Sequence, residues 1–170
     1  MLKFLSRITG SGRAEIRDAK KIYAKTMRAS RNPAFFGPDM VADDFDGRME
    51  VLCLNLAVLT HRLRGLGEQG LRLSQALYDA MVADFDIALR EECLTDSGVS
   101  RRIKPMVLMY LTRVKTYCEG LELKQGKEAA IEDILRKLVL HAETGQEAQL
   151  AALLAYVMEL DENMAKAGLG

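Results

Sequence analysis

Three aspartates in the middle of the chain have a spacing that could support chemistry. Asp79, Asp84 and Asp86 fall within residues 73–91, a stretch without Pro or Gly that predicts one uninterrupted helix. Carboxylates gathered in this way can hold a divalent metal ion for hydrolysis. One hypothesis is therefore a metal-dependent helical enzyme that uses these three carboxylates.

The same predicted helix divides into a narrow polar sector and a wide apolar one. At about 100° per residue, the polar sector holds Gln75, Asp79, Asp86 and Arg90. Asp84 and Glu91 project into the apolar part of the circumference. A helix that is apolar nearly all round is a central helix, and a carboxylate buried there must be paired or hydrogen-bonded. The pattern thus predicts a central, largely buried helix over residues 71–94, with acids that lock it in place.

Little in the sequence completes a catalytic site. The two histidines, His61 and His141, lie on separate predicted helices, and neither belongs to a zinc-binding motif such as HExxH. The three cysteines form no CxxC pair, and no glycine-rich phosphate loop is present. Structure or partner recognition is therefore favoured over catalysis. We expect no cofactor, and the lack of an axial histidine pair argues against haem.

The composition bounds the class of protein. With 170 residues, 49% of them hydrophobic and 28% charged, the chain is long enough for one domain with a good core. An odd number of cysteines favours a reducing compartment. No apolar run approaches the ~20 residues that span a bilayer. Residues 1–13 are too interrupted by charge for a signal peptide, although a short organelle transit peptide remains an alternative.

A net charge of zero hides a basic amino-terminal region. Residues 1–35 contain nine Lys or Arg and two acids, an excess of seven positive charges that the rest of the chain balances. Such asymmetry predicts docking on an anionic surface, either a membrane or ribosomal RNA, although a solvated face is the plainer alternative. No base-reading motif is visible, so sequence-specific nucleic-acid binding is not expected. The candidate docking residues are Lys3, Arg7, Arg13, Arg17, Lys20, Lys21 and Lys25.

Hydrophobic periodicity predicts an all-α fold. Helical spacing occurs in six segments: residues 14–31, 44–64, 71–94, 101–121, 128–142 and 146–166. Asn32-Pro33 should end the first segment, and Ser100 is the expected cap of the fourth, with Pro105 in its first turn. No segment shows the alternation of apolar and polar residues that is typical of a β-strand. The expected fold is an irregular bundle of about six helices.

A short loop after the first helix carries two adjacent aromatic side chains. Phe35 and Phe36 precede a Gly-Pro turn signal. They are either core anchors or an exposed apolar contact for a partner. The sequence alone leaves both alternatives open.

Four segments, taken in order, carry a similarity to a known family. They are IYAKTMRASRNPAFF, which begins near Tyr23, then DGRMEVLCLNLAVLTHRL, LSQALYDAMVADFDIALREE and VSRRIKPMVLMYLTRVKTYCEGL. Together they resemble the ubiquinol–cytochrome c chaperone family, whose members assist assembly of the respiratory ubiquinol–cytochrome c reductase. The order and spacing of these segments are specific together, though each piece alone is weak.

The resemblance implies roles for individual residues. It implies a set of internal polar locks: Asp46, Arg48, Asp84, Glu91, Lys104, Arg113 and Tyr117. Asp84 is expected to pair with a cation of another helix, namely Arg48, Lys104 or Arg113. The candidate residues for binding a client or partner are Tyr23, Arg28, Phe35, Phe36, Gln75, Asp79, Asp86 and Arg90.

The resemblance also implies a non-enzymatic chaperone that binds newly made cytochrome b. The other implied partners are the ribosome near its exit tunnel and a small partner subunit. A bacterial member would act from the cytoplasm as a peripheral protein of the inner membrane, and a mitochondrial member from the matrix side. The expected organisation is a basic extension with the start of the first helix (1–22), a helical chaperone core (23–123) and a carboxy-terminal helical pair (124–170).

Overall fold

The chain is helical through most of the parts that the structure describes. The computed structural model describes residues 12–37, 40–91, 95–141 and 146–166. Its elements are α2 (Gly12–Ser30), the 3-10 helix η1 (Pro33–Phe35), α3 (Phe45–Arg64), α4 (Gly67–Glu91), α5 (Asp96–Leu121), α6 (Lys127–Leu138) and α7 (Glu147–Lys166). Within these ranges no β-strand forms, and Phe36 and Val41 make an isolated bridge. The predicted all-α bundle is confirmed.

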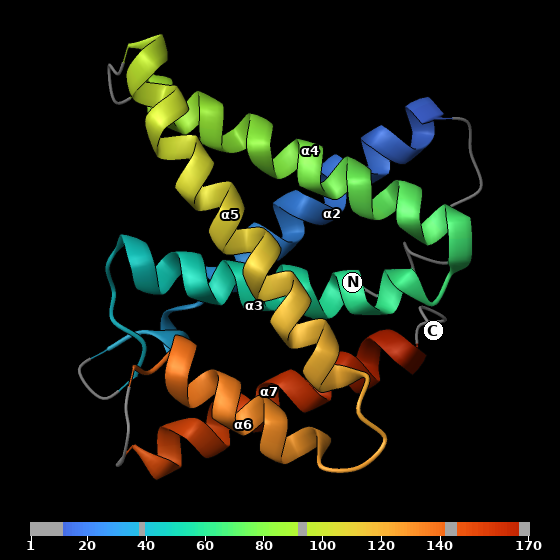
Figure 1. Cartoon of the computed structure of the whole chain (residues 1–170), viewed down its shortest axis with the longest axis vertical. Coiled ribbons are helices and arrows are strands. Elements are labelled where there is room, and N and C mark those ends of the chain that lie inside the picture. Colours follow the sequence, from blue (N-terminus) through green and yellow to red (C-terminus); the bar gives the residue numbers. More distant parts are fainter. Residues whose placement is uncertain (1–11, 38–39, 92–94, 142–145, 167–170) are drawn as a thin grey trace.

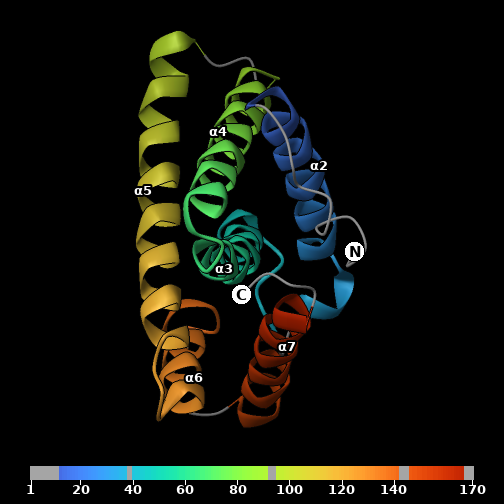
Figure 2. The ribbon, with the colours of Figure 1, turned by 90° about the vertical axis from the view of Figure 1, so that its right-hand side faces the viewer.

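The helices pack around α3, which runs through the middle of the molecule (Figure 1). Helices α2 and α4 lie side by side on one flank of α3, and α6 and α7 pair on the opposite flank (Figure 2). Helix α5 packs against α3, α4 and α6 from the outside. None of the described helices is both long enough and apolar enough to cross a bilayer.

Helix α3, not α4, is the central helix, so the prediction for residues 71–94 is wrong on this point. Of the 20 residues of α3, 14 are buried, including every one from Val51 to Thr60. Helix α4 has 25 residues and buries a single stripe of six: Gly70, Leu73, Leu77, Met81, Phe85 and Leu89. The physical reason is side-chain size, because four of its other apolar residues are alanines and an alanine left in water forfeits little hydrophobic free energy.

Two glycines allow segments of backbone to approach closely. A Cβ atom on Gly47 would lie 2.0 Å from the carbonyl oxygen of Ala42, so the loop before α3 can pack on the first turn of that helix. A Cβ atom on Gly70 would lie 1.6 Å from the carbonyl oxygen of Leu63. Helix α4 therefore leaves the end of α3 at a contact that no larger residue could make.

Helix α5 begins at Asp96, earlier than the predicted residue 101. Thr95 is its N-cap, and the hydroxyl oxygen of Thr95 accepts a hydrogen bond of 3.3 Å from the backbone N–H of Gly98. Ser100 consequently lies inside the helix, and the predicted Ser100 cap is wrong. Pro105 also lies in the interior, where its missing N–H removes one helical hydrogen bond.

Candidate binding groove

The aspartates of α4 bind different partners instead of gathering at one point. Asp79 accepts a hydrogen bond of 2.9 Å from Gln75 Nε2. Asp86 accepts one of 2.6 Å from Arg90 Nε, and Asp84 binds a tyrosine of α2. In the described part of the chain, no group of three or more His, Cys, Asp or Glu side chains could hold a metal ion. These residues therefore give the metal-dependent alternative no support.

Asp84 links α4 to α2 at the surface rather than inside the bundle. Its Oδ2 atom accepts a hydrogen bond of 2.9 Å from the hydroxyl of Tyr23, and Asp84 itself is exposed. Tyr23 is buried, and this burial, together with the adjacent carboxylate, raises its pKa, so the hydroxyl remains a donor. The predicted buried ion pair between Asp84 and a cation of another helix is therefore wrong.

The three cations expected beside Asp84 lie elsewhere. Arg113 of α5 reaches Glu50 of α3, with its Nε atom 2.8 Å from Oε2 and its Nη2 atom 2.5 Å from Oε1. Arg48 donates from Nε to Asp43 at 2.7 Å. Lys104 is exposed on α5.

Glu50 and Arg113 form the buried lock between α3 and α5. Glu50 is 2% exposed, and its hydrogen bonds raise the pKa of Arg113. Tyr117, one turn beyond Arg113, is fully buried, and burial raises its pKa. Glu50 is not among the residues predicted from the sequence, although it is the one charged residue between Arg48 and His61. A lone acid in so long an apolar run was the available signal.

A second buried carboxylate ties the carboxy-terminal helices to α3. Asp161 of α7 is 3% exposed, and Arg62 donates to it from Nε at 2.6 Å and from Nη2 at 2.5 Å. Lys127 of α6 places its Nζ atom 3.8 Å from the same carboxylate. His61 Nε2 lies 4.0 Å away, but burial lowers the pKa of His61 and favours the neutral ring. These ion pairs were also missed from the sequence.

The segment Asp46-Gly47-Arg48 organises the loop before α3. The carboxylate of Asp44 caps the helix by accepting a hydrogen bond of 2.8 Å from the backbone N–H of Gly47. The guanidinium of Arg48 lowers the pKa of Asp43 through their hydrogen bond. Asp46 and Arg48 are exposed, whereas Gly47 is buried beneath the loop. These hydrogen bonds hold the loop in place, and the loop forms one wall of a cavity beside α2 and α4.

A groove opens between α2 and α4 and extends to the start of α3. Two adjoining hollows of about 530 and 450 Å³ form it, and both are lined by Met27, Arg31 and Asp84. We call it the α2–α4 groove; its other lining residues are Lys20, Tyr23, Ala24, Arg28, Ser30, Asp43, Asp44, Phe45, Arg48, Met49, Leu52, Ala80, Ala83, Phe85, Ile87, Ala88, Leu89 and Met106. Figure 2 shows the two long helices that border it.

The α2–α4 groove combines an apolar surface with a basic wall. Phe45 and Ile87 are 60% and 57% exposed although both are large and apolar. Helix α2 contributes Lys20 and Arg28 to this wall, the residue that follows the helix, Arg31, adds a third cation, and no acid of α2 lines it. Exposed apolar groups in a concave site with a few charged groups are typical of a binding groove.

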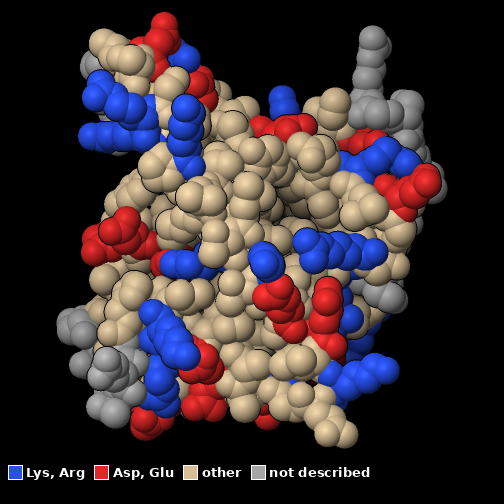
Figure 3. All heavy atoms as spheres, in the orientation of Figure 1, with Lys and Arg blue, Asp and Glu red and all other residues tan. Residues whose placement is uncertain are grey.

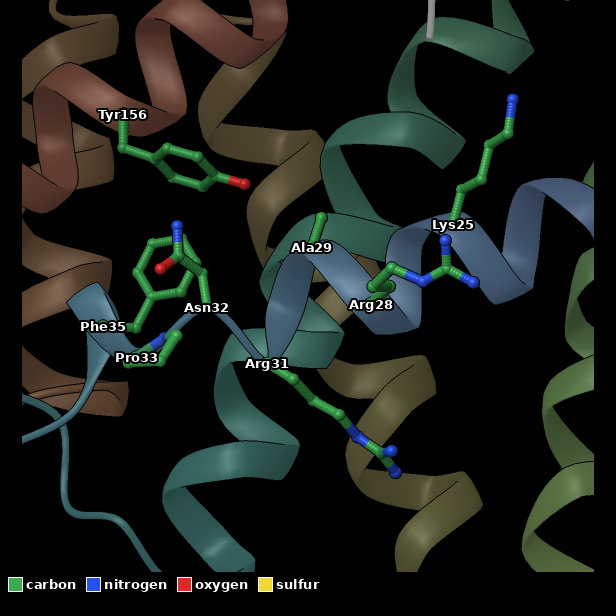
Figure 4. A pocket seen from close by; sticks show the side chains of 8 residues that line it. All are labelled: Lys25, Arg28, Ala29, Arg31, Asn32, Pro33, Phe35 and Tyr156. Carbon is green, nitrogen blue, oxygen red and sulfur yellow. The ribbon is translucent and has the colours of Figure 1, made fainter.

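A third hollow, of about 610 Å³, adjoins the groove where α2 ends (Figure 4). The ring of Phe35 meets that of Tyr156 edge to face at 4.8 Å, and the hydroxyl of Tyr156 donates to Asn55 at 2.5 Å. Phe35 is 7% exposed, so it is a core anchor and is not available to a partner, whereas Phe36 is half-buried. Lys25 and Arg31 extend away from the ring pair in Figure 4.

The remaining predicted residues lie at separate places. The polar sector of α4 lies outside the groove, and Arg90 there also binds Asp96 at 2.6 Å, which joins α4 to α5. Glu91 is exposed. Of the candidate docking residues, Lys3 and Arg7 lie outside the described residues, and Arg13 lies in α2. Arg17, Lys20, Lys21 and Lys25 are exposed along α2.

An all-α bundle with an apolar, partly basic groove has the features of a protein that binds another protein. A model of the ubiquinol–cytochrome C chaperone family matches residues 40–167. The chain therefore belongs to this family. Membership of a chaperone family implies a client protein in complex assembly rather than catalysis.

A solved structure agrees with this assignment. The crystal structure of the Cbp3 homolog from Brucella abortus is similar with a TM-score of 0.70 and 26% sequence identity. The similarity covers 86% of this chain and 79% of that one. No curated protein sequence matches significantly.

Proposed function

We propose that this chain is an assembly chaperone of the ubiquinol–cytochrome c reductase and that the α2–α4 groove holds its client, newly made cytochrome b. The family match supports the chaperone role. The observation that carries the proposed site is the concave surface where Phe45 and Ile87 remain exposed beside the basic wall of α2.

The chemistry of the groove suits an apolar helical segment. An amphipathic or apolar helix can lay its side chains into a groove between two helices, and the alanines of α4 leave room for them. Lys20, Arg28 and Arg31 would face the more polar end or an acidic flank of such a segment. A subunit made of apolar membrane helices has segments of this kind to shield before assembly.

Further partners belong to the same proposal. The basic amino-terminal stretch supports docking on an anionic membrane surface or on the ribosome, where a nascent client emerges. A small partner subunit would complete the complex. For a bacterial chain the proposed location is the cytoplasmic side of the inner membrane, and for a mitochondrial chain it is the matrix side.

Deleting the gene tests the proposed function. We expect the deletion strain to lose assembled reductase and cytochrome b while a second respiratory complex, measured in the same membranes, keeps its level. Re-expression of the wild-type chain should restore both. Normal amounts of reductase and cytochrome b in the deletion strain would contradict the proposal.

A further inference from the structure

The outer face of α5 carries an exposed stripe of apolar and basic side chains. Figure 2 shows α5 along one edge of the molecule, and the helices that contact it, α3, α4 and α6, lie on its inner side. At about 100° per residue, exposed Ser97, Thr112 and Glu119 lie on its outward face together with six exposed apolar and basic residues: Arg101, Lys104, Pro105, Leu108, Leu111 and Lys115. We call these six residues the α5 stripe.

The apolar members of the stripe are unusually open to solvent. Leu108 is 66% exposed and Leu111 is 49% exposed, about one helical turn apart. A single exposed leucine needs no explanation, but two on one face with apolar Pro105 between cations form a patch. Neither leucine lines the α2–α4 groove.

The charged members of the stripe are Arg101, Lys104 and Lys115, and Lys115 lies 3.8 Å from the carboxylate of Glu119 on the same helix face. The excess of cations therefore lies toward the start of α5. Residues 97–118 contain five Lys or Arg and no Asp or Glu, although the whole chain has equal numbers of both signs. Arg113 turns inward to Glu50, whereas Arg101, Lys104 and Lys115 are exposed outward. In Figure 3 basic side chains gather at the upper left, over the start of α5, with acidic side chains above and beside them and a broad uncharged area below.

We propose that the α5 stripe docks this protein on the surface of a bilayer that contains anionic lipids. A helix face with exposed apolar side chains between cations lies in the plane of a membrane interface, where the leucines enter the acyl boundary and the lysines reach the headgroups. Nucleic acid would use the cations but not the leucines. This contact is separate from the amino-terminal docking residues and does not depend on which client is bound.

A matched pair of variants of the full chain tests the stripe by sedimentation with vesicles of phosphatidylcholine and phosphatidylglycerol. The stripe variant carries Lys104→Glu and Leu108→Ser; the control carries Lys124→Glu and Leu123→Ser, which are the same two residue changes at another exposed place. We expect the stripe variant to bind at least about tenfold more weakly than the control, since each cation near anionic lipid contributes roughly a fivefold factor. Equal binding by the two variants would overturn the proposal.

Fluorescence tests whether the leucine enters the bilayer. The chain has no Trp, so Leu108→Trp and Leu123→Trp each report from one position. We expect the emission of Leu108→Trp to shift to shorter wavelength on adding the anionic vesicles, with no shift for Leu123→Trp. No shift at position 108 would overturn the proposal. So would loss of vesicle binding by Lys104→Glu alone with no loss by Leu108→Ser alone, which would indicate a purely electrostatic surface for RNA or an acidic protein.

Discussion

Helices α3 and α4 are both rich in apolar residues, but α3 lies in the core and α4 is buried along one stripe only. Helix α3 is buried on every side from Met49 to Thr60, and its one acid in that region, Glu50, is paired with Arg113. Helix α4 buries one stripe and presents alanines, Ile87 and Asp84 to the α2–α4 groove. The difference shows that side-chain size decides which apolar helix becomes the core, because large side chains repay burial and alanines do not.

The polar groups of the two helices differ in the same way. Glu50 sits in a site closed to water, so its charge must be matched. Asp84 keeps contact with solvent and binds a neutral hydroxyl. An acid in α3 therefore holds the fold, while an acid in α4 shapes a surface.

The comparison is tested most strongly at Arg113. Replacing it by methionine leaves the buried Glu50 carboxylate without a partner, and we expect the free energy of unfolding to fall by ~3–5 kcal/mol. Urea unfolding measures this loss. The control is Lys115→Met, on the exposed face of the same helix, which should change stability by less than ~0.5 kcal/mol. Equal losses for the two variants would mean that Glu50 is not buried as described.

A smaller effect is expected where α4 leaves α3. Gly70→Ala would push a methyl group into the carbonyl of Leu63, so we expect a loss of ~1–3 kcal/mol. At an ordinary helical position the same change stabilises, because alanine is the better helix former. Thermal unfolding distinguishes the two signs, with exposed Glu68→Ala as the control. A gain in stability would show that α3 and α4 are not in contact at this point.

The surface link between α4 and α2 should matter less again. Asp84→Ala removes the acceptor of the Tyr23 hydroxyl, and we expect a loss of ~1 kcal/mol, the usual net value of one hydrogen bond. A cycle with Tyr23→Phe should give a coupling energy of similar size. A loss as large as that of Arg113→Met would instead place Asp84 in the core.

The smallest predicted effect is a pH dependence centred on His61. Burial lowers its pKa below 6.5, so the unfolded chain takes up a proton more readily than the folded one. Neutral His61 therefore contributes fully to the stability of the folded chain above about pH 6.5. That stability is lost as the pH falls from there toward the pKa that His61 has in the folded chain. Melting temperatures between pH 7.5 and 5 should fall less steeply for His61→Gln than for the wild type. Parallel curves would contradict the assignment.

The sequence predicted the positions of the helices along the chain well, but not how deeply each helix is buried. Apolar spacing and Asn32-Pro33 located the helices within a few residues, since such signals are local. The central helix was misjudged because Ala80, Ala83 and Ala88 counted as apolar although they line a groove. Glu50 with Arg113, and Arg62 with Asp161, are far apart in the chain, so no local pattern could pair them. The α2–α4 groove is formed mainly by α2, α4 and the start of α3, which are separate segments of the chain. The sequence therefore did not predict it.

The most direct test of the account compares Ile87→Asp with Leu71→Asp. Both residues lie on α4 and both are 57% exposed, but only Ile87 lines the α2–α4 groove. Each variant is purified by affinity from solubilised membranes, and the cytochrome b that accompanies it is quantified. Because burying an unpaired charge in an apolar contact costs several kcal/mol, we expect Ile87→Asp to retain less than about a tenth of the cytochrome b that Leu71→Asp retains. Equal recovery with the two variants would contradict the proposal that this groove holds the client.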